Sequence, residues 1–323
     1  IIRWADLPIL AFTHLQPAEP TTLGYRLAQY AQDIWMDRVS LQQVKGDLRG
    51  KGFKGAVGTS ASYADLFGLE RLDEFERRLG EQLQLKFYPV ATQIYPRKQD
   101  YRIVSALAGL AGSLSKFAFD LRFLQSPPIG EWAEPFGRKQ VGSSAMPFKR
   151  NPVIAEKIDS LARFLAQLPR IAWDNAAHSL LERTLDDSAN RRIILPEACL
   201  CADELLGAMI AIVQGLNVDE AALARNLATY GPFAATERVL MALSRAGADR
   251  QAMHERLRVH AMQAWEVIRQ GQPNPLLELI VQDQAFHAFL PQEQLQALLD
   301  ASRHIGVAPR RARALAQEII NTI

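Results

Sequence analysis

Cysteine is scarce in this sequence, and so is any excess of charge of one sign. Of the 323 residues only two are cysteines, Cys199 and Cys201, and their spacing suits neither a disulfide framework nor a zinc knuckle. Lysine and arginine number 37 against 35 aspartates and glutamates, so the net charge of +2 gives no general attraction to nucleic acid or to an anionic membrane. We therefore expect free thiols in a reducing compartment, and no nucleic-acid or membrane partner.

Long apolar runs and cofactor fingerprints are also lacking. No apolar run approaches the roughly 20 residues of a membrane span. The opening IIRWADLPILAFTHLQP has no charged region before a small-residue cleavage site. Neither a P-loop nor a Rossmann glycine pattern occurs, and no histidine has the spacing of a metal ligand relative to another histidine or to the cysteines. The sequence thus predicts a cytoplasmic protein without metal or cofactor.

What the sequence does contain is helical periodicity. Apolar residues recur at three- and four-residue steps over two long segments, 23–48 and 103–124. Residues 153–180 and 187–215 are candidates for two more long helices. Because narrow apolar stripes of this length need partner helices, the pattern predicts a helical bundle.

A connector, GLNVDE at 215–220, separates two kinds of helix. Beyond it the helices are shorter and more conventionally amphipathic, as in EAALARNLATYG. No strand-rich region or internal repeat stands out. We predict an all-α protein with a long-helix bundle domain over residues 1–217 and a smaller helical domain over residues 218–323.

Between the helical stripes, the segment VGSSAMPFKRNP combines flexible backbone with hydrogen-bond donors. It contains two hydroxyls, Ser143 and Ser144, two cations, Lys149 and Arg150, and the amide of Asn151, just before a predicted helix. Donors at a helix N-terminus favour a bound anion, because unpaired N–H groups and the helix dipole both attract negative charge. By composition alone, however, a solvated loop between helices is the more common structure.

The order of residues in this segment resembles the signature loop of the fumarase/aspartase superfamily, GSSxMPxKxN, and matches every fixed position. Members eliminate fumarate from a succinyl group and share a long-helix bundle fold. The resemblance implies that Ser143 is the base that removes the Cβ proton. It also implies that Ser144, Lys149 and Asn151 hold the substrate carboxylates, with Lys149 stabilising the carbanion-like intermediate.

A second motif, FTHLQPAEPTTLG, precedes the first long helical stripe. It resembles the superfamily block in which a histidine after threonine transfers a proton near the leaving group, which implies His14 for this role and Thr13 as a substrate contact. Glu156, seven residues after Lys149, matches the acid that pairs with this histidine. A lone histidine is nevertheless more often structural, and a carboxylate in the first turn of a helix is favoured by the dipole in any case.

The segment LERTLDDSANRR is unusually polar for a link between two apolar helices. It resembles the adenylosuccinate lyase form of the superfamily, which implies that Arg183, Ser188 and Arg192 contact a nucleotide substrate. Arginine suits bidentate recognition of carboxylate and phosphate. The structural alternative is an ion-paired capping segment with Asp186 or Asp187 as the N-cap.

Two weaker matches complete the expected site. Gln93, in VATQIYPRKQD, corresponds to a glutamine that contacts substrate in the family, although a glutamine before a helix is more often solvated. Lys157 is the candidate for a phosphate contact, at a position where family members vary between arginine and other polar residues.

Together the motifs resemble the adenylosuccinate lyases over essentially the whole chain. This implies two cofactor-free reactions: adenylosuccinate gives AMP and fumarate, and the succinyl-carboxamide ribotide (SAICAR) gives AICAR and fumarate. It also implies a homotetramer whose active sites are shared between subunits. These enzymes carry a front domain with a further histidine and nucleotide contacts, and we expect that domain to be missing because it has no counterpart before Thr13.

Two rival interpretations remain. Argininosuccinate lyase performs the same elimination on another succinyl adduct, and RTLDDSANRR argues against it. A non-catalytic oligomeric scaffold that retains the fold has no need of Ser143, Lys149 and His14. The elimination of fumarate from a succinylated purine nucleotide is therefore the function that the sequence favours.

Overall fold

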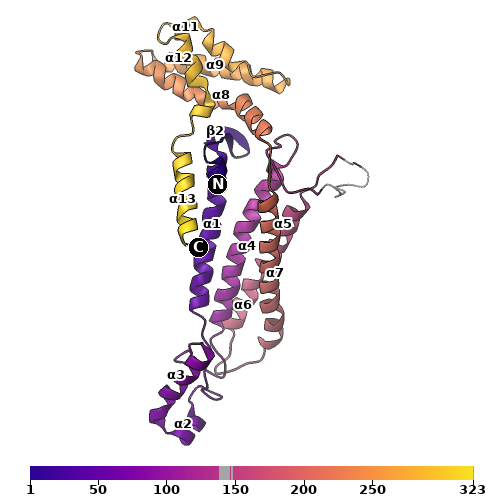
Figure 1. Cartoon of the computed structure of the whole chain (residues 1–323), viewed down its shortest axis with the longest axis vertical. Coiled ribbons are helices and arrows are strands. Elements are labelled where there is room, and N and C mark those ends of the chain that lie inside the picture. Colours follow the sequence, from indigo (N-terminus) through magenta and orange to yellow (C-terminus); the bar gives the residue numbers. More distant parts are fainter. Residues whose placement is uncertain (138–145, 147, 323) are drawn as a thin grey trace. The chain divides into compact units, whose positions relative to one another are not determined.

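The computed structural model describes residues 1–137, 146 and 148–322, and helices dominate its secondary structure (Figure 1). The all-α fold class predicted from the sequence is confirmed. The elements, in chain order, are η1 (Ile2–Trp4), β1 (Pro8–Thr13), β2 (Gln16–Thr22), α1 (Leu23–Gly46), α2 (Ala61–Phe67), η2 (Leu69–Arg71), α3 (Leu72–Leu83), α4 (Lys98–Leu124), β3 (Trp132–Ala133), α5 (Val153–Leu165), α6 (Leu168–Ala177), α7 (Ser188–Gly215), β4 (Asn217–Val218), α8 (Glu220–Arg245), α9 (Arg250–Arg269), α10 (Leu276–Val281), α11 (Gln284–His287), α12 (Gln292–Leu299), η3 (Ala301–Arg303) and α13 (Ala308–Thr322).

The chain forms two compact units. The hairpin unit comprises Ile1–Gln32, Ser126–Trp132 and Val218–Ile323, and the bundle unit comprises Asp33–Gln125 and Ala133–Asn217. One boundary between the units falls at the end of α7, where the sequence changes character. The division into two domains at residues 217 and 218 stays a prediction.

Helix α4 is the centre of the bundle unit and packs against α5, α6 and α7 (Figure 1). The predicted stripe along α4 is buried at Leu114, Phe117 and Leu121, as expected for a helix whose apolar face meets neighbouring helices. Polar contacts reinforce the packing, because the buried carboxylate of Asp159 in α5 pairs with Arg122 at 2.8 Å. The bundle fold therefore follows directly from the periodicity of the sequence.

The composition of α4 alone does not distinguish a core helix from a membrane span. Among the described residues α4 is the one helix long and apolar enough to cross a membrane, and 39% of its most apolar window is buried within the chain. Its packing against three other helices is a sufficient reason for the apolar composition. The finding is therefore weak evidence for a membrane.

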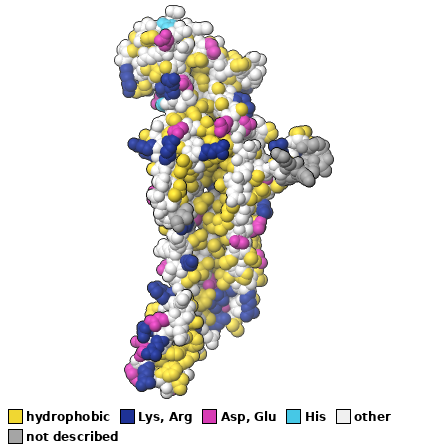
Figure 2. Space-filling model, in the orientation of Figure 1, with side chains coloured by type: hydrophobic (Ala, Val, Ile, Leu, Met, Phe, Trp, Pro, Cys, Tyr) yellow, Lys and Arg dark blue, Asp and Glu magenta, His cyan; other side chains and the backbone are white. Residues whose placement is uncertain are grey.

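Much apolar surface of the bundle unit is exposed in the single chain. Ile193, Leu200, Ile210 and Val213 of α7 each expose more than half of their surface. Figure 2 shows hydrophobic side chains along the length of the visible face of this unit. A patch of this extent on one face typically marks an interaction surface.

The segment before α1 is a β-hairpin, which the sequence analysis did not anticipate. Strands β1 and β2 pair antiparallel, with a bulge between Leu10 and Phe12, and both strands pack against α8. Proline lacks an N–H donor, yet Pro17 and Pro20 are tolerated because each strand of a two-stranded ribbon has a free outer edge. The proline-rich stretch is therefore an edge strand rather than an irregular entry to a helix.

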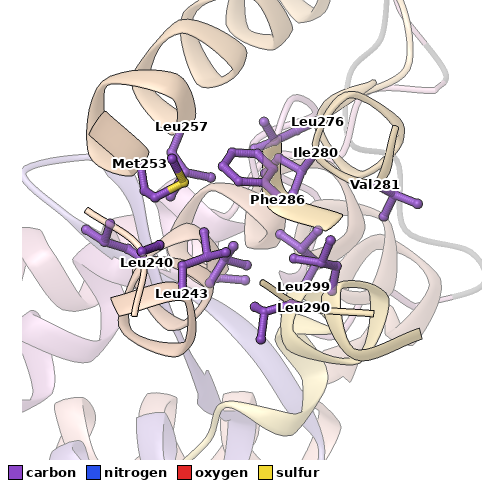
Figure 3. Packing of buried hydrophobic residues seen from close by; sticks show 14 of the residues in the cluster. Leu240, Leu243, Met253, Leu257, Leu276, Ile280, Val281, Phe286, Leu290 and Leu299 are labelled. Carbon is purple, nitrogen blue, oxygen red and sulfur yellow. The ribbon is translucent and has the colours of Figure 1, made fainter. Parts of the chain in front are cut away.

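Helix α8 is held by a second core in the hairpin unit (Figure 3). Leu243 of α8 is fully buried together with Leu276 and Ile280 of α10 and Phe286 of α11. At about 25 cal/mol per Å² of apolar surface, each such side chain contributes about 2 to 3 kcal/mol. The hairpin packs on α8 through a separate buried cluster of Leu10, Leu227 and Ala301.

The end of α7 approaches the segment that precedes the GSSAMPFKRNP motif. A Cβ atom added to Gly215 would lie 2.6 Å from Cβ of Pro135, so no larger residue fits without a shift of the proline. Gly46 ends α1 in the same way, but a Cβ atom added to it would have no other atom within 4 Å. The two helix ends therefore differ in the space around them.

We expect Gly215→Ala to lower the free energy of unfolding by about 1 to 3 kcal/mol, because overpacking displaces Pro135. Gly46→Ala is the matched control and should change it by less than about 1 kcal/mol. Urea unfolding followed by circular dichroism measures both values. Equal stabilities of the two variants would contradict the proposed close contact.

Candidate active site

His14 lies at the tip of the hairpin. Thr13 pairs with Gln16, so the connection consists of His14 and Leu15, with φ angles of 54° and 60°. Such two-residue turns favour glycine or asparagine, because the left-handed region costs other residues about 1 to 2 kcal/mol each. Strain that persists at an exposed turn supports a functional reason for the residues that bear it. The structure therefore presents the imidazole on a fixed, solvent-exposed turn.

A buried polar network anchors the base of this hairpin. Arg26 of α1 donates to the carbonyl of Leu10 beside the bulge and pairs with the fully buried carboxylate of Glu131 at 2.7 Å. Asn226 of α8 donates to the other oxygen of Glu131 at 3.0 Å. Because every charge in the network has a partner, it fixes the strand that leads to His14 without leaving a buried ion uncompensated.

The signature segment is described in part. Ser143 and Ser144 lie outside the described residues. Lys149 is exposed and Asn151 is half-buried, and both directly precede α5. Glu156 is exposed in the first turn of α5, and its predicted pairing with His14 stays a prediction.

Lys157 follows Glu156 in the same helix turn. Its ammonium lies 2.6 Å from Glu204 of α7, and both side chains are about half exposed. An exposed pair of this kind contributes at most about 1 kcal/mol, so it leaves Lys157 accessible to a stronger anionic partner. The predicted phosphate contact stays a prediction.

The N-terminus of α5 is occupied by a residue that sequence reasoning missed. The carboxylate of Glu134, only 3% exposed, accepts hydrogen bonds from the N–H groups of Ile154 and Ala155 at 2.9 to 3.1 Å. Burial raises the pKa of Glu134, while these N–H groups favour its charged form. The expectation that unpaired N–H groups here would bind a substrate anion is therefore wrong for Ile154 and Ala155.

The arginine-bearing segment lies at the start of α7. The backbone N–H of Gln93 donates to the backbone carbonyl of Glu182 at 3.3 Å, which brings two of the predicted substrate-binding stretches together. Arg183 is bonded to Asp187, Ser188 is the first residue of α7, and Arg192 is exposed with no ion-pair partner among the described residues. Arg192 is thus the accessible cation of this group.

Asp187 organises the segment through ion pairs rather than through helix capping. It stands at the N-cap position of α7, but its side chain makes no capping bond. Instead it accepts from Arg97 at 2.5 Å and from Arg183 at 3.0 Å. Burial alone would raise the pKa of Asp187, but the bonds and charges of the two arginines outweigh it and hold that pKa below its usual range.

A second buried group extends this network. Arg191 donates to Asp100 and to the hydroxyl of Tyr95, both at 2.6 Å, and that hydroxyl donates to Asp100 at 2.8 Å. Sequence reasoning missed Tyr95, Arg97 and Asp100. The signal was the dense mixture of charges in YPRKQD just before a long apolar stripe.

The two groups of candidate residues occupy opposite ends of the bundle unit (Figure 1). Gln93, Arg183 and Arg192 lie beside the Lys98 end of α4, where Arg191 pairs with Asp100. Lys149 and Asn151 lie beside the Leu124 end, where Gln125 binds the carbonyl of Arg150. A 27-residue helix is about 40 Å long at 1.5 Å per residue. The structure of one chain therefore does not bring the two groups into one site.

No metal centre is evident in the residues that the structure describes, since no group of three His, Cys, Asp or Glu side chains could hold an ion there. Both cysteines are free; Cys201 is buried and Cys199 is exposed.

Comparison with known protein families identifies relatives of the chain. The profile of a family described as "Lyase" matches residues 3–164, and one described as "Adenylosuccinate lyase C-terminus" matches residues 232–315. The adenylosuccinate lyase of Saccharomyces cerevisiae is 39% identical, over 99% of this chain and 66% of its own length. That of Archaeoglobus fulgidus is 33% identical, over 96% of this chain and 67% of its own length. The chain thus spans about two thirds of the length of these relatives.

Solved structures share the fold. A 3-carboxy-cis,cis-muconate lactonizing enzyme from Pseudomonas putida superposes with a TM-score of 0.85 at 29% identity, over 99% of this chain and 69% of that protein. A fumarate lyase from Mesorhizobium sp. BNC1 superposes with a TM-score of 0.81 at 24% identity, over 97% of this chain and 67% of that protein. The predicted superfamily fold is confirmed.

We expect Asp187→Asn to lower the free energy of unfolding by about 3 to 5 kcal/mol at neutral pH, because Arg97 loses its buried partner. The pKa of Asp187 is depressed in the folded state, so its contribution is fully present above the usual aspartate pKa of about 3.9 and is lost as pH falls below it. Urea titrations at neutral and acidic pH should show the gap between wild type and variant closing in acid. Asp186→Asn, at the exposed neighbouring residue, is the control; an equal loss there would contradict the role of Asp187.

Proposed function

The chain belongs to the adenylosuccinate lyase family, and from this premise we propose that the protein eliminates fumarate from adenylosuccinate, giving AMP, and from SAICAR, giving AICAR. One observation carries the proposal. GSSAMPFKRNP, which matches the fumarate-eliminating loop, occurs in the same chain as RTLDDSANRR, which matches the nucleotide-binding form. The reaction needs both a proton-abstracting loop and a cationic nucleotide site.

In the proposed mechanism each residue either transfers a proton or stabilises a charge. Ser143 removes the Cβ proton, and the electron pair of that bond is delocalised into the neighbouring carboxylate, where Lys149 and Asn151 stabilise the added charge. The electrons then form the carbon–carbon double bond of fumarate as the C–N bond breaks. The departing nitrogen keeps its electron pair and receives a proton from His14, which Glu156 orients.

The nucleotide is proposed to bind at the Lys98 end of α4. Arg192 is exposed for phosphate or carboxylate, and Arg183 is oriented by its bond to the buried Asp187. Gln93 and Ser188 supply neutral hydrogen bonds. Thr13 and Lys157 complete the proposed set of substrate contacts.

A site that uses both ends of α4 requires more than one copy of the chain. About 40 Å of helix separates the carboxylate-binding residues from the nucleotide-binding residues, and a nucleotide cannot span that length. The exposed apolar side chains along α7, among them Ile193 and Ile210, offer a surface through which copies could pack. We therefore propose a homotetramer in which different subunits contribute to each active site.

Fumarate release from three adducts separates this function from its rivals. We expect fumarate from adenylosuccinate and SAICAR, with AMP and AICAR as co-products, and none from argininosuccinate. Lys149→Met should lower kcat by about 100-fold or more, because the intermediate loses its cation. Activity with argininosuccinate alone would favour the other lyase. Silence of the intact protein with all three substrates would favour a scaffold, and lactonisation of 3-carboxy-cis,cis-muconate would point to the reaction named for the Pseudomonas putida relative.

Mixing two inactive proteins tests the shared site. We expect His14→Ala and Ser143→Ala proteins to be inactive alone, and to regain part of the wild-type activity after dissociation and reassembly together. The reason is that some mixed sites then contain both intact residues. Size-exclusion chromatography checks that each variant assembles. Absence of recovery from well-assembled mixtures would contradict a site shared between chains.

A further inference from the structure

Glu134 has no task in the proposed mechanism, yet it lies buried within the segment that leads to the signature residues. Its side chain reaches α5, twenty residues further along, and accepts from the N–H groups of Ile154 and Ala155. Pro152, the N-cap residue of α5, provides no side-chain cap. A distant carboxylate therefore does what a local serine or aspartate does at most helix starts.

Gln125 connects Glu134 to Arg150, which lies just before α5. Its side-chain oxygen accepts from the backbone N–H of Glu134 at 2.9 Å, and its side-chain nitrogen donates to the carbonyl of Arg150 at 3.1 Å. The guanidinium of Arg150 also lies 5.2 Å from the ring centroid of Phe136. Residues 134–136 and residue 150 are thus held together, and we call Gln125, Glu134, Phe136 and Arg150 the clasp.

The electrostatics of the clasp differ from those of other buried carboxylates of the chain. Glu131, Asp159 and Asp187 each pair with an arginine. Glu134 forms no ion pair within the described residues, and only N–H groups and the dipole of α5 compensate its charge. An aliphatic residue would avoid the desolvation cost, so a buried carboxylate with no ion pair in the described part of the chain calls for a specific reason.

Two consequences follow for the neighbouring candidate residues. First, Glu134 holds the first turn of α5 in place. It therefore fixes the direction of the Glu156 side chain and the backbone position from which the side chains of Lys149 and Asn151 extend. Second, Glu134 fills the anion position at the helix start. A substrate carboxylate must then be held by side chains such as Lys149, which can follow the charge as it develops.

We propose that Glu134 and Gln125 are positioning residues of the elimination reaction, and that the clasp sets the geometry of Lys149, Asn151 and Glu156. This inference rests on the proposed function. The clasp touches no reacting atom; it acts through the residues that do. Misplacement of a reacting group by about 1 Å costs up to about 100-fold in rate, so loss of the clasp is expected to appear in kcat.

Single substitutions test each half of the clasp in the intact protein with adenylosuccinate. Glu134→Gln keeps the volume but leaves one acceptor oxygen for two N–H groups, and we expect kcat per mole of folded protein to fall about 10- to 100-fold. Gln125→Ala removes the bridge to Arg150 and should lower kcat about 10-fold. KM should change less than about threefold in both, because Arg183 and Arg192 at the other end of α4 are untouched.

The matched controls are Glu266→Gln and Gln292→Ala, which make the same chemical changes at exposed positions of α9 and α12. Both should retain wild-type kcat. Circular dichroism and size-exclusion chromatography give the amount of folded, assembled protein for each variant, so that a stability effect is separated from a catalytic one. If Glu134→Gln does not assemble, Gln125→Ala alone decides the question.

A double-mutant cycle on kcat tests whether the two residues act as one unit. We expect the Glu134→Gln/Gln125→Ala protein to lose less activity than the product of the two single effects, because the second change removes a clasp that is already broken. Wild-type kcat per folded protein in both single variants, a rise in KM without a fall in kcat, or fully multiplicative effects would each overturn the inference. An inactive wild type would instead count against the proposed function.

Discussion

The hydrogen bonds of α4 impose the constraint on which the arrangement of this protein depends. A 27-residue helix cannot shorten without breaking backbone bonds, so its two ends stay about 40 Å apart whatever the surrounding loops do. Each end then carries its own set of polar residues, in the loops that enter α7 and α5. If both sets serve one site, as proposed above, they can meet only through association between copies of the chain.

The two ends are built on different electrostatic principles. At the Lys98 end, Asp187 and Asp100 pair with three arginines in a compact network, which holds Arg183 in place and leaves Arg192 exposed. At the Leu124 end, the buried carboxylate of Glu134 accepts from backbone N–H groups and has no arginine or lysine partner among the residues that the structure describes. The first arrangement tolerates an additional anion near its cations. The second arrangement already contains its own anion, so a bound carboxylate would have to be held by flexible side chains.

The sequence allowed the helices and the motifs to be predicted, because both depend on residues close together in the chain. The stripe through Leu114, Phe117 and Leu121 is a local pattern, and burial followed from it. The contacts of Glu134 with α5 and of Asp187 with Arg97 join residues 20 and 90 positions apart, and no periodicity signals such pairs. The hairpin was missed for another reason. Prolines usually argue against strands, and the left-handed turn is formed by His14 and Leu15, which are not residue types that favour such a turn.

That turn also limits how this part of the protein can change over evolutionary time. Side chains alternate between the two faces of a strand, so one residue gained or lost between Thr13 and Gln16 would turn every following residue of β2 to the opposite face. Pro20 and Thr22, now buried, would exchange places with the less buried Glu19 and Thr21. The turn can therefore accept a different residue at Leu15, including one better suited to a left-handed conformation, far more readily than it can accept a different length.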